Sequence, residues 1–333
     1  MKLSIEQLRS MTQGAVRVFE IDGSACFRRF TDEQEELYRI SNEEFWKKTF
    51  STAGIKLCFE TNSEIMDLSV LALESTSRTY FSIDIFSDDQ FVGAIENHTE
   101  DFLAGDYSEV RFPLGHFEKE FVLGSGMKTV TIYLPWSVEL RIESLCLDDQ
   151  AEIIPVKTEK TLLVFGDSIT HGYDAVHPVN RYAAQAARAL QAEEYNKAIG
   201  GEVFFPELAE AKENFDPDYI LIAYGTNDWG LTTWDKFSKN CREFYKILAE
   251  QYPKANIYAL APIWRKDFEE VRECCDFRQV AAYIHEVTKP YTNIKVIDCF
   301  DFVPKEECYF ADFKLHPNDK GFEHYGKKLI VHI

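Results

Sequence analysis

The stretch TLLVFGDSITHG, residues 161–172, joins a short apolar run to a glycine turn that is followed by an aspartate and a serine. A run such as TLLVF is typical of a strand that is buried in a parallel sheet. The tripeptide Gly166-Asp167-Ser168 does not decide the chemistry, because serine and aspartate also favour the N-cap of a helix. Whether Ser168 is a nucleophile or a cap therefore depends on the rest of the chain.

After residue 160, short apolar runs alternate with amphipathic segments long enough to form helices. Strands are expected at 161–165, 195–199, 218–224, 256–262 and 293–298, and helices around 179–192, 204–213, 233–251, 267–287 and 319–330. This alternation predicts a doubly wound parallel sheet with helices on both faces. The second half of the chain is therefore expected to have an α/β fold.

The first half has a different pattern, in which apolar and polar residues alternate with a period of two. Strands are expected at 54–60, 68–74, 80–87, 128–134 and 139–147, and the main helical segment at 31–40. Strands that follow strands predict an antiparallel β-sandwich or jelly roll. The polar stretch 148–160, which contains Pro155, separates the two patterns. We therefore predict a sandwich domain over residues 1–155 and an α/β domain over residues 156–333.

The composition limits the classes of partner. A formal net charge of −20 argues against nucleic acid and anionic membranes, because both require a basic surface, and it favours a neutral or weakly charged small molecule. No apolar run of about 18 residues could span a bilayer, and the N-terminus lacks the apolar core of a signal peptide. The eight cysteines include no C-x-x-C pair, and the histidines show no metal-ligand spacing. We therefore expect reduced thiols, a cytoplasmic location and no metal.

Residues that can carry chemistry follow the predicted strands of the second half. Ser168 comes after the first strand, Gly200 and Gly201 after the second, and Asn227 after the third, while His316 stands just before the last helix. Ligands of such sheets bind beyond the carboxyl ends of the strands, so these residues are expected to converge on one rim.

This set of residues suits acyl transfer. A serine hydroxyl becomes a good nucleophile when a base takes its proton, and His316 titrates in the useful range. The tetrahedral intermediate carries an oxyanion that needs preorganised donors. The backbone N–H groups of Ser168 and Gly201 and the side-chain amide of Asn227 could supply three. Gly200 competes with its neighbour for this role, and a glycine suits it because no Cβ blocks the substrate.

Four blocks, in this order, resemble the SGNH or GDSL-type hydrolase family: Ser168 in GDSIT, Gly201 in AIGG, Asn227 in GTND and His316 in LHPND. The resemblance covers roughly the second half of the chain. It implies a flavodoxin-like three-layer α/β/α fold, no cofactor, and hydrolysis of esters, thioesters or acetylated sugars. A β-sandwich before such a domain resembles carbohydrate esterases of family two and related acylhydrolases, which implies removal of O-acetyl groups from sugars.

The last block departs from the family pattern, which usually places an orienting aspartate three residues before the histidine. Here Phe313 stands three residues before His316, and Asp312 stands four before it. Two arrangements stay open. A bulge or turn brings Asp312 to Nδ1 of His316 and completes a triad, or a backbone carbonyl orients the ring and leaves a Ser-His dyad.

The sequence also offers weaker candidates. Possible substrate contacts are Asp167, Trp229, Trp264 and Arg265, which all flank the predicted site. His171 is expected at the pocket entrance and His324 inside the last helix. The leading function is a serine esterase, active as a monomer or homodimer on a small ester, with an acetylated sugar as the expected substrate. The alternatives are a lysophospholipase or thioesterase, and a carbohydrate-binding protein with an inactive hydrolase domain.

Overall fold

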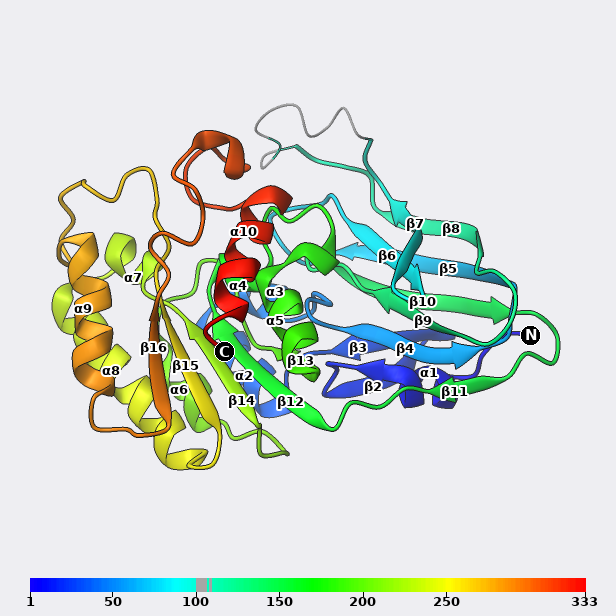
Figure 1. Ribbon diagram of the computed structural model, residues 1–333, viewed down its shortest axis with the longest axis horizontal. Helices are drawn as coiled ribbons and strands as arrows, with labels where there is room; N and C mark the ends of the chain where they lie inside the picture. Colours follow the sequence, from blue (N-terminus) through cyan, green and yellow to red (C-terminus); the bar gives the residue numbers. More distant parts are fainter. Residues whose placement is uncertain (100–106, 108–109) are drawn as a thin grey trace.

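The computed structural model describes residues 1–99, 107 and 110–333 of the 333-residue chain. Two antiparallel sheets lie at one end of the molecule, and a parallel sheet with its helices lies at the other (Figure 1). The fold therefore combines the two sheet types that the two sequence patterns predict.

The antiparallel sheets form a sandwich over an apolar core. One sheet has the order β2 (Arg17–Ile21), β3 (Ser24–Arg28), β10 (Val138–Leu147), β5 (Ile65–Glu74) and β8 (Gly115–Val122). The other has the order β1 (Thr12–Gln13), β4 (Lys56–Thr61), β9 (Lys128–Tyr133), β6 (Ser82–Ser87) and β7 (Gln90–Glu96), with β11 (Ile153–Pro155) paired to β4. Every second residue of β5 from Met66 to Ala72 is buried in the core between them, as period-two alternation requires.

The parallel sheet has the order β13 (Ala192–Asn196), β12 (Lys160–Gly166), β14 (Tyr219–Ala223), β15 (Asn256–Ala261) and β16 (Ile294–Asp298). This is the strand order of flavodoxin-like folds. Strand β12 is apolar on both faces: Leu163 and Phe165 belong to one core and Leu162 and Val164 to the other. The sheet is therefore covered on both sides, which explains why its three central strands, β12, β14 and β15, are nearly continuous apolar runs rather than alternating ones.

Helices cover both faces of the parallel sheet (Figure 1). They are α4 (Ser168–His171), η2 (Pro178–Asn180), α5 (Tyr182–Leu190), α6 (Pro206–Glu210), α7 (Thr226–Leu231), α8 (Trp234–Gln251), α9 (Phe277–Thr288), η3 (Glu307–Tyr309) and α10 (Asp319–Ile330). The prediction of a helix over 267–287 is wrong in its first part, because α9 begins only at Phe277. No helix among the described residues is long and apolar enough to cross a membrane.

Part of the N-terminal chain packs against the α/β half. This part contains α2 (Asp32–Ser41) and α3 (Glu43–Lys48), whereas α1 (Ile5–Met11) packs in the sandwich core. Tyr38 of α2 belongs to a core that also holds residues of β12 and β14. Arg29, fully buried, donates hydrogen bonds to the backbone carbonyls of Asn196 and Ala198. The border between residues 155 and 156 separates the sheet types, but as a border between independent domains it stays a prediction.

Candidate active site

Ser168 is placed by the turn that ends strand β12. A Cβ on Gly166 would lie 2.3 Å from the hydroxyl of Thr170 and 2.8 Å from the carbonyl of Ala223, so this close turn requires glycine. Asp167 is the N-cap of α4, where its carboxylate accepts the N–H of Ile169 at 3.1 Å. The capping role therefore belongs to Asp167, and the hydroxyl of Ser168, the first residue of the helix, is left for another partner.

That partner is His316. The distance between Ser168 Oγ and His316 Nε2 is 2.8 Å, and the distance between His316 Nδ1 and Asp312 Oδ2 is also 2.8 Å. An ionised carboxylate only accepts, so Nδ1 carries the proton and donates it to Asp312. Nε2 of the neutral ring then accepts the hydroxyl proton of Ser168. The geometry is that of the triad arrangement rather than of the dyad.

The backbone at Phe313 accommodates the shifted position of the aspartate. Phe313 has φ +57°, in the left-handed region, which reverses the chain immediately after Asp312. Asp312 Oδ1 accepts the N–H groups of Lys314, Leu315 and His316 at 3.0, 2.7 and 3.1 Å. The carboxylate thus holds its own loop together and still reaches the ring through Oδ2.

The charges at the site stabilise the charged forms of both His316 and Asp312. Burial is the largest single effect on the pKa of His316 and lowers it, but the hydrogen bond to Asp312 and the charges of Asp174 and Asp312 raise it above its usual value. Burial likewise raises the pKa of Asp312, but the His316 ring and the loop N–H groups outweigh it and hold this pKa well below its usual range. The pair is therefore arranged to stabilise an imidazolium ion.

Asp174 is a residue of the site that sequence reasoning missed. Its Oδ2 lies 3.6 Å from His316 Nδ1, and the residue is completely buried. The only sequence signal is an aspartate six residues after Ser168, in DSITHGYD, and a lone acidic residue in a loop carries little information.

Each of the three predicted oxyanion donors retains one N–H group that no described residue accepts. The N–H of Ser168, at the first position of a helix, has no helical partner. The N–H of Gly200 donates to His171 Nδ1 at 3.2 Å, whereas no described residue accepts the N–H of Gly201. Asn227 Nδ2 donates to the carbonyl of Glu202 at 3.0 Å, which uses one of its two amide protons and ties Asn227 to the loop that carries Gly201. Gly201 is therefore favoured over Gly200.

His171 does not line the pocket entrance, and that expectation is wrong. The side chain is completely buried, and its Nε2 lies 2.7 Å from Ser51 Oγ and 3.1 Å from the carbonyl of Trp136. Since Nδ1 accepts the N–H of Gly200, the proton resides on Nε2. Burial lowers the pKa of His171 well below its usual value, so the ring is neutral and supports the glycine loop from within. His324 lies inside α10, as expected, with its ring edge-on to Tyr309.

Three of the four candidate substrate contacts are buried. Trp229 is fully buried and donates its indole N–H to the carbonyl of Cys275. Arg265 stacks on the Trp229 ring at 4.9 Å and forms an ion pair with Asp267. Trp229, Asp167 and Arg265 expose 0%, 2% and 8% of their surface, so they present little surface to a substrate, and their role as contacts stays a prediction. Trp264 is half-buried and packs on Phe310 at 5.3 Å, so it keeps some exposed surface.

Three buried carboxylates lie behind the site. Burial raises the pKa of Asp167 to about 6, of Asp228 to about 7 and of Glu202 to about 8. Asp228 accepts the N–H groups of Phe204 and Gly225, and so it braces the loop. Glu202 accepts the hydroxyls of two tyrosines, Tyr38 and Tyr224, at 2.5 and 2.6 Å. These bonds fix the two loops that carry Gly201 and Asn227.

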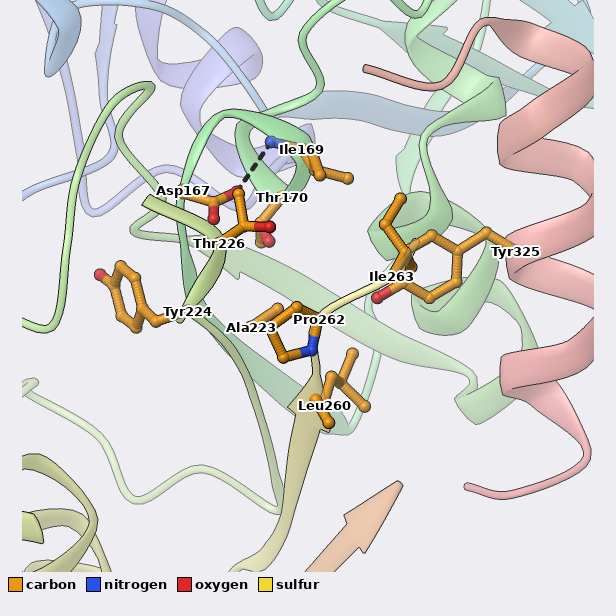
Figure 2. A pocket seen from close by; sticks show the side chains of 11 residues that line it. Asp167, Ile169, Thr170, Ala223, Tyr224, Thr226, Leu260, Pro262, Ile263 and Tyr325 are labelled. Atoms are coloured by element: carbon orange, nitrogen blue, oxygen red, sulfur yellow. Dashed lines mark hydrogen bonds between the residues drawn. The ribbon is translucent and has the colours of Figure 1, made fainter. Parts of the chain in front are cut away.

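A small cavity separates the Ser168 turn from strand β15. Figure 2 shows Asp167, Thr170 and Thr226 on its polar side, and its apolar side includes Leu260, Pro262, Ile263 and Tyr325. The cavity has about 20 Å³. This is the size of a single water site, too small for an acyl group. The hydroxyl of Thr226 is buried in the wall with no partner among the described residues, as expected beside one water molecule.

The side chains of Asp174, Asp312 and His316 bring one donor atom each within 4.8 Å of one another, a spacing that a metal ion could use. Arg78 donates to Asp174 at 2.9 Å, and Nδ1 of His316 already donates to Asp312. The cation beside these carboxylates is thus the guanidinium of Arg78, and we assign no metal to them.

Three comparisons with known proteins bear on this geometry. Residues 164–324 match the model of the GDSL-like lipase/acylhydrolase family. No curated protein sequence matches the chain.

Several solved structures share the fold over nearly their whole length. A salicylyl-acyltransferase of a tetracycline biosynthetic pathway is 18% identical with a TM-score of 0.77, and the match covers 96% of this chain and 92% of that one. A protein described as a GDSL-like lipase from Bacteroides ovatus is 19% identical with a TM-score of 0.76, covering 100% and 98%. A family two carbohydrate esterase from Cellvibrio japonicus is 15% identical with a TM-score of 0.67, covering 100% and 96%. At such identities the likeness establishes the fold.

Proposed function

Residues 164–324 belong to the GDSL-like lipase/acylhydrolase family, which makes the protein a hydrolase of ester bonds, and we propose that it is a serine esterase. In this proposal it removes acetyl groups from carbohydrate through an acyl-enzyme on Ser168. The observation that carries the proposal is the unbroken chain of hydrogen bonds from Ser168 through His316 to Asp312. It supplies a nucleophile, a base and an orienting group.

The proposed reaction has two halves. Ser168 Oγ attacks the ester carbonyl while its proton passes to His316 Nε2, and Asp312 keeps the ring in the tautomer that can accept it. The carbonyl oxygen becomes an oxyanion that accepts hydrogen bonds from the N–H groups of Ser168 and Gly201 and from the Asn227 amide. His316 then protonates the sugar oxygen as its bond to the carbonyl carbon breaks, so the sugar leaves as an alcohol and the acetyl group stays on Ser168. In the second half, water attacks the acetyl carbonyl while His316 takes its proton, and His316 then returns this proton to Ser168 Oγ as the Ser168–acetyl bond breaks and acetic acid, which ionises to acetate, is released.

Two observations support a short acyl group on a neutral substrate. The chain shares its two-part fold with a family two carbohydrate esterase over its whole length. Its net charge of −20 disfavours approach to anionic lipid surfaces and to nucleic acid.

The eight free cysteines favour a reducing, cytoplasmic location. A monomer or homodimer remains the expected oligomeric state.

The test is hydrolysis of p-nitrophenyl esters of increasing chain length beside acetylated sugars. We expect the highest kcat/KM with acetyl esters, and Ser168→Ala to reduce kcat by about 10⁴ or more. Ser10→Ala, an exposed serine on α1, is the matched control and should leave the rate unchanged. A preference for octanoate or longer esters would instead indicate a lysophospholipase or thioesterase. Inactivity towards every ester would favour a carbohydrate-binding protein with an inactive hydrolase domain.

A further inference from the structure

Asp174 is a second carboxylate beside the ring nitrogen that donates to Asp312. It is completely buried, and its backbone has φ +69°, a left-handed conformation that aspartate tolerates better than most residues. Its Oδ2 lies 3.6 Å from His316 Nδ1, beyond the range of a good hydrogen bond. Asp174 therefore does not compete with Asp312 for the Nδ1 proton, and it acts on the ring through its charge.

Residues of the N-terminal half hold Asp174 in this place. Arg78 donates to its two oxygens at 2.9 and 3.3 Å, and the hydroxyl of Tyr80 donates to Oδ1 at 2.8 Å. The hydroxyl of Tyr107 donates to the backbone carbonyl of Asp174 at 2.9 Å. A buried charge is tolerated when it is paired and hydrogen-bonded, and these donors meet that condition. The position of this charge is therefore set by the contact between the two halves of the molecule.

We propose that Asp174 is a positioning residue for His316: a carboxylate shared with Arg78 that stabilises the imidazolium formed when Ser168 attacks. The inference rests on the proposed function, because it requires His316 to act as the base. It gives the sandwich side a part in the reaction, since Arg78 and Tyr80 determine how much of the negative charge reaches the ring.

Asp174 and its partner Arg78 have opposite effects on the pKa of His316. Burial lowers the pKa of His316, and the carboxylates Asp312 and Asp174 raise it, whereas the charge of Arg78 lowers it. The ring of Tyr173 lies between these groups, 5.9 Å from the His316 ring and 5.4 Å from the guanidinium of Arg78. Removing Asp174 or removing Arg78 should therefore move the titration of His316 in opposite directions.

Other titratable groups near the ring do not produce this pattern. Burial raises the pKa values of Tyr80 and Tyr107 above their usual range, so both phenols stay uncharged at neutral pH. Asp167 also interacts with the histidine, but from α4 and not through Arg78. Among the described residues, the charged and titratable groups that act on the ring include Asp312, Asp174, Arg78, Tyr173 and Asp167, and Tyr80 and Tyr107 are linked to it through Asp174.

The first experiment is the pH profile of kcat/KM with p-nitrophenyl acetate for the wild type, Asp174→Asn and Arg78→Gln. The acid limb reports the ionisation of the base in the free enzyme. We expect Asp174→Asn to lower its midpoint by about half to one pH unit and kcat by up to about tenfold. Arg78→Gln should raise the midpoint, and Arg78→Lys, which keeps the charge, should leave it near the wild-type value.

A second variant and a second measurement cover a failure to fold. Tyr80→Phe removes one donor from Asp174 and keeps the ring, so it should raise the midpoint by less than Arg78→Gln does. The imidazole of His316 can also be titrated by NMR in the Ser168→Ala background, independently of activity. Midpoints that stay unchanged, or that move in the same direction in Asp174→Asn and Arg78→Gln, would overturn the proposal. An inactive wild type would refute the proposed function and with it a role of Asp174 in catalysis, whereas the NMR midpoints would separately show whether Asp174 and Arg78 control the pKa of His316.

Discussion

Two carboxylates face the same nitrogen of His316, and the molecule holds them in opposite ways. Asp312 belongs to the loop that carries the histidine, and three N–H groups of that loop fix one of its oxygens. Asp174 follows the nucleophile turn and is fixed by Arg78 and Tyr80, which come from the other half of the chain. One carboxylate depends on a few consecutive residues, and the other depends on how two sheets are packed together.

This difference separates two tasks that one base requires. The ring must be held in one orientation and one tautomer, which needs a direct hydrogen bond at 2.8 Å. Its charged form must also be stabilised in a buried place, and a charge at 3.6 Å does so without taking the proton. Asp312, from the same loop as His316, thus orients the ring, and Asp174, held by residues distant in the sequence, stabilises its positive charge.

The largest expected effect is that of Asp312→Asn. The amide can donate to Nδ1 and stabilise the wrong tautomer, so we expect kcat for p-nitrophenyl acetate to fall by about 10⁴. Asp301→Asn, an aspartate on an exposed turn, is a matched control and should retain full activity. A loss of less than tenfold for Asp312→Asn would favour the dyad and remove the contrast between the two carboxylates.

The next effect is the coupling between the two carboxylates, measured by combining Asp312→Asn with Asp174→Asn. With Asp312 absent, Asp174 is the remaining carboxylate near Nδ1, so its charge matters more than in the wild type. We expect the Asp312→Asn/Asp174→Asn protein to lose more than the product of the two single effects, by about tenfold, since interacting groups are not additive. Rates of all four proteins at one pH give this coupling. Strict additivity would show that the two carboxylates act independently.

The local parts of this architecture could be predicted from the sequence. Four of the five strands of the parallel sheet lie where they are predicted, whereas β13 (Ala192–Asn196) begins three residues before the predicted strand 195–199, because its sequence AEEYN is not an apolar run. Four blocks after the predicted strands mark Ser168, Gly201, Asn227 and His316. Strand β8 was missed because it lies at the edge of its sheet, where the central stretch Glu118–Glu120 is charged and exposed and no apolar alternation develops.

The parts that depend on long-range packing could not be predicted. Trp229 follows GTND directly, and its sequence position suggested a pocket wall, but burial under Arg265 is visible only in the fold. His171 looked accessible for the same reason and is enclosed by Trp136 and Ser51 from the other half. The proposed role of Asp174 could not be predicted either, because it depends on the hydrogen bond from Arg78, which stands nearly a hundred residues earlier in the chain.

A smaller effect is expected at Phe313, where substitutions test whether the Asp312 loop depends on the backbone conformation alone or also on the phenyl ring. Its side chain is 41% exposed, and what the loop requires is its left-handed backbone. Phe313→Gly should therefore keep kcat within about twofold, because glycine adopts this conformation without a steric penalty. Phe313→Val should lower kcat and thermal stability, since β-branched residues strongly disfavour positive φ. Equal losses in both variants, measured by esterase rate and melting temperature, would show that the phenyl ring itself matters.

The smallest effect concerns the contact between the halves, which the long-range carboxylate requires. His177 Nδ1–H donates to Asp84 of β6 at 2.8 Å, and this bond raises the pKa of His177 to about 9 although burial opposes it. Because the folded pKa lies above the unfolded value of about 6.5, the bond stabilises fully below pH 6.5 and is lost as the pH rises through 9.

The wild type should therefore lose more stability than His177→Gln between about pH 6.5 and 9, measured by urea unfolding across that range. Glu202, Asp228 and Lys197 titrate in the same window, with pKa values of about 8, 7 and 8, so the difference between the two proteins is the quantity that isolates His177. Parallel stability curves for the two proteins would mean that this ion pair does not hold the halves together. The placement of Asp174 would then depend on Arg78 and the tyrosines alone.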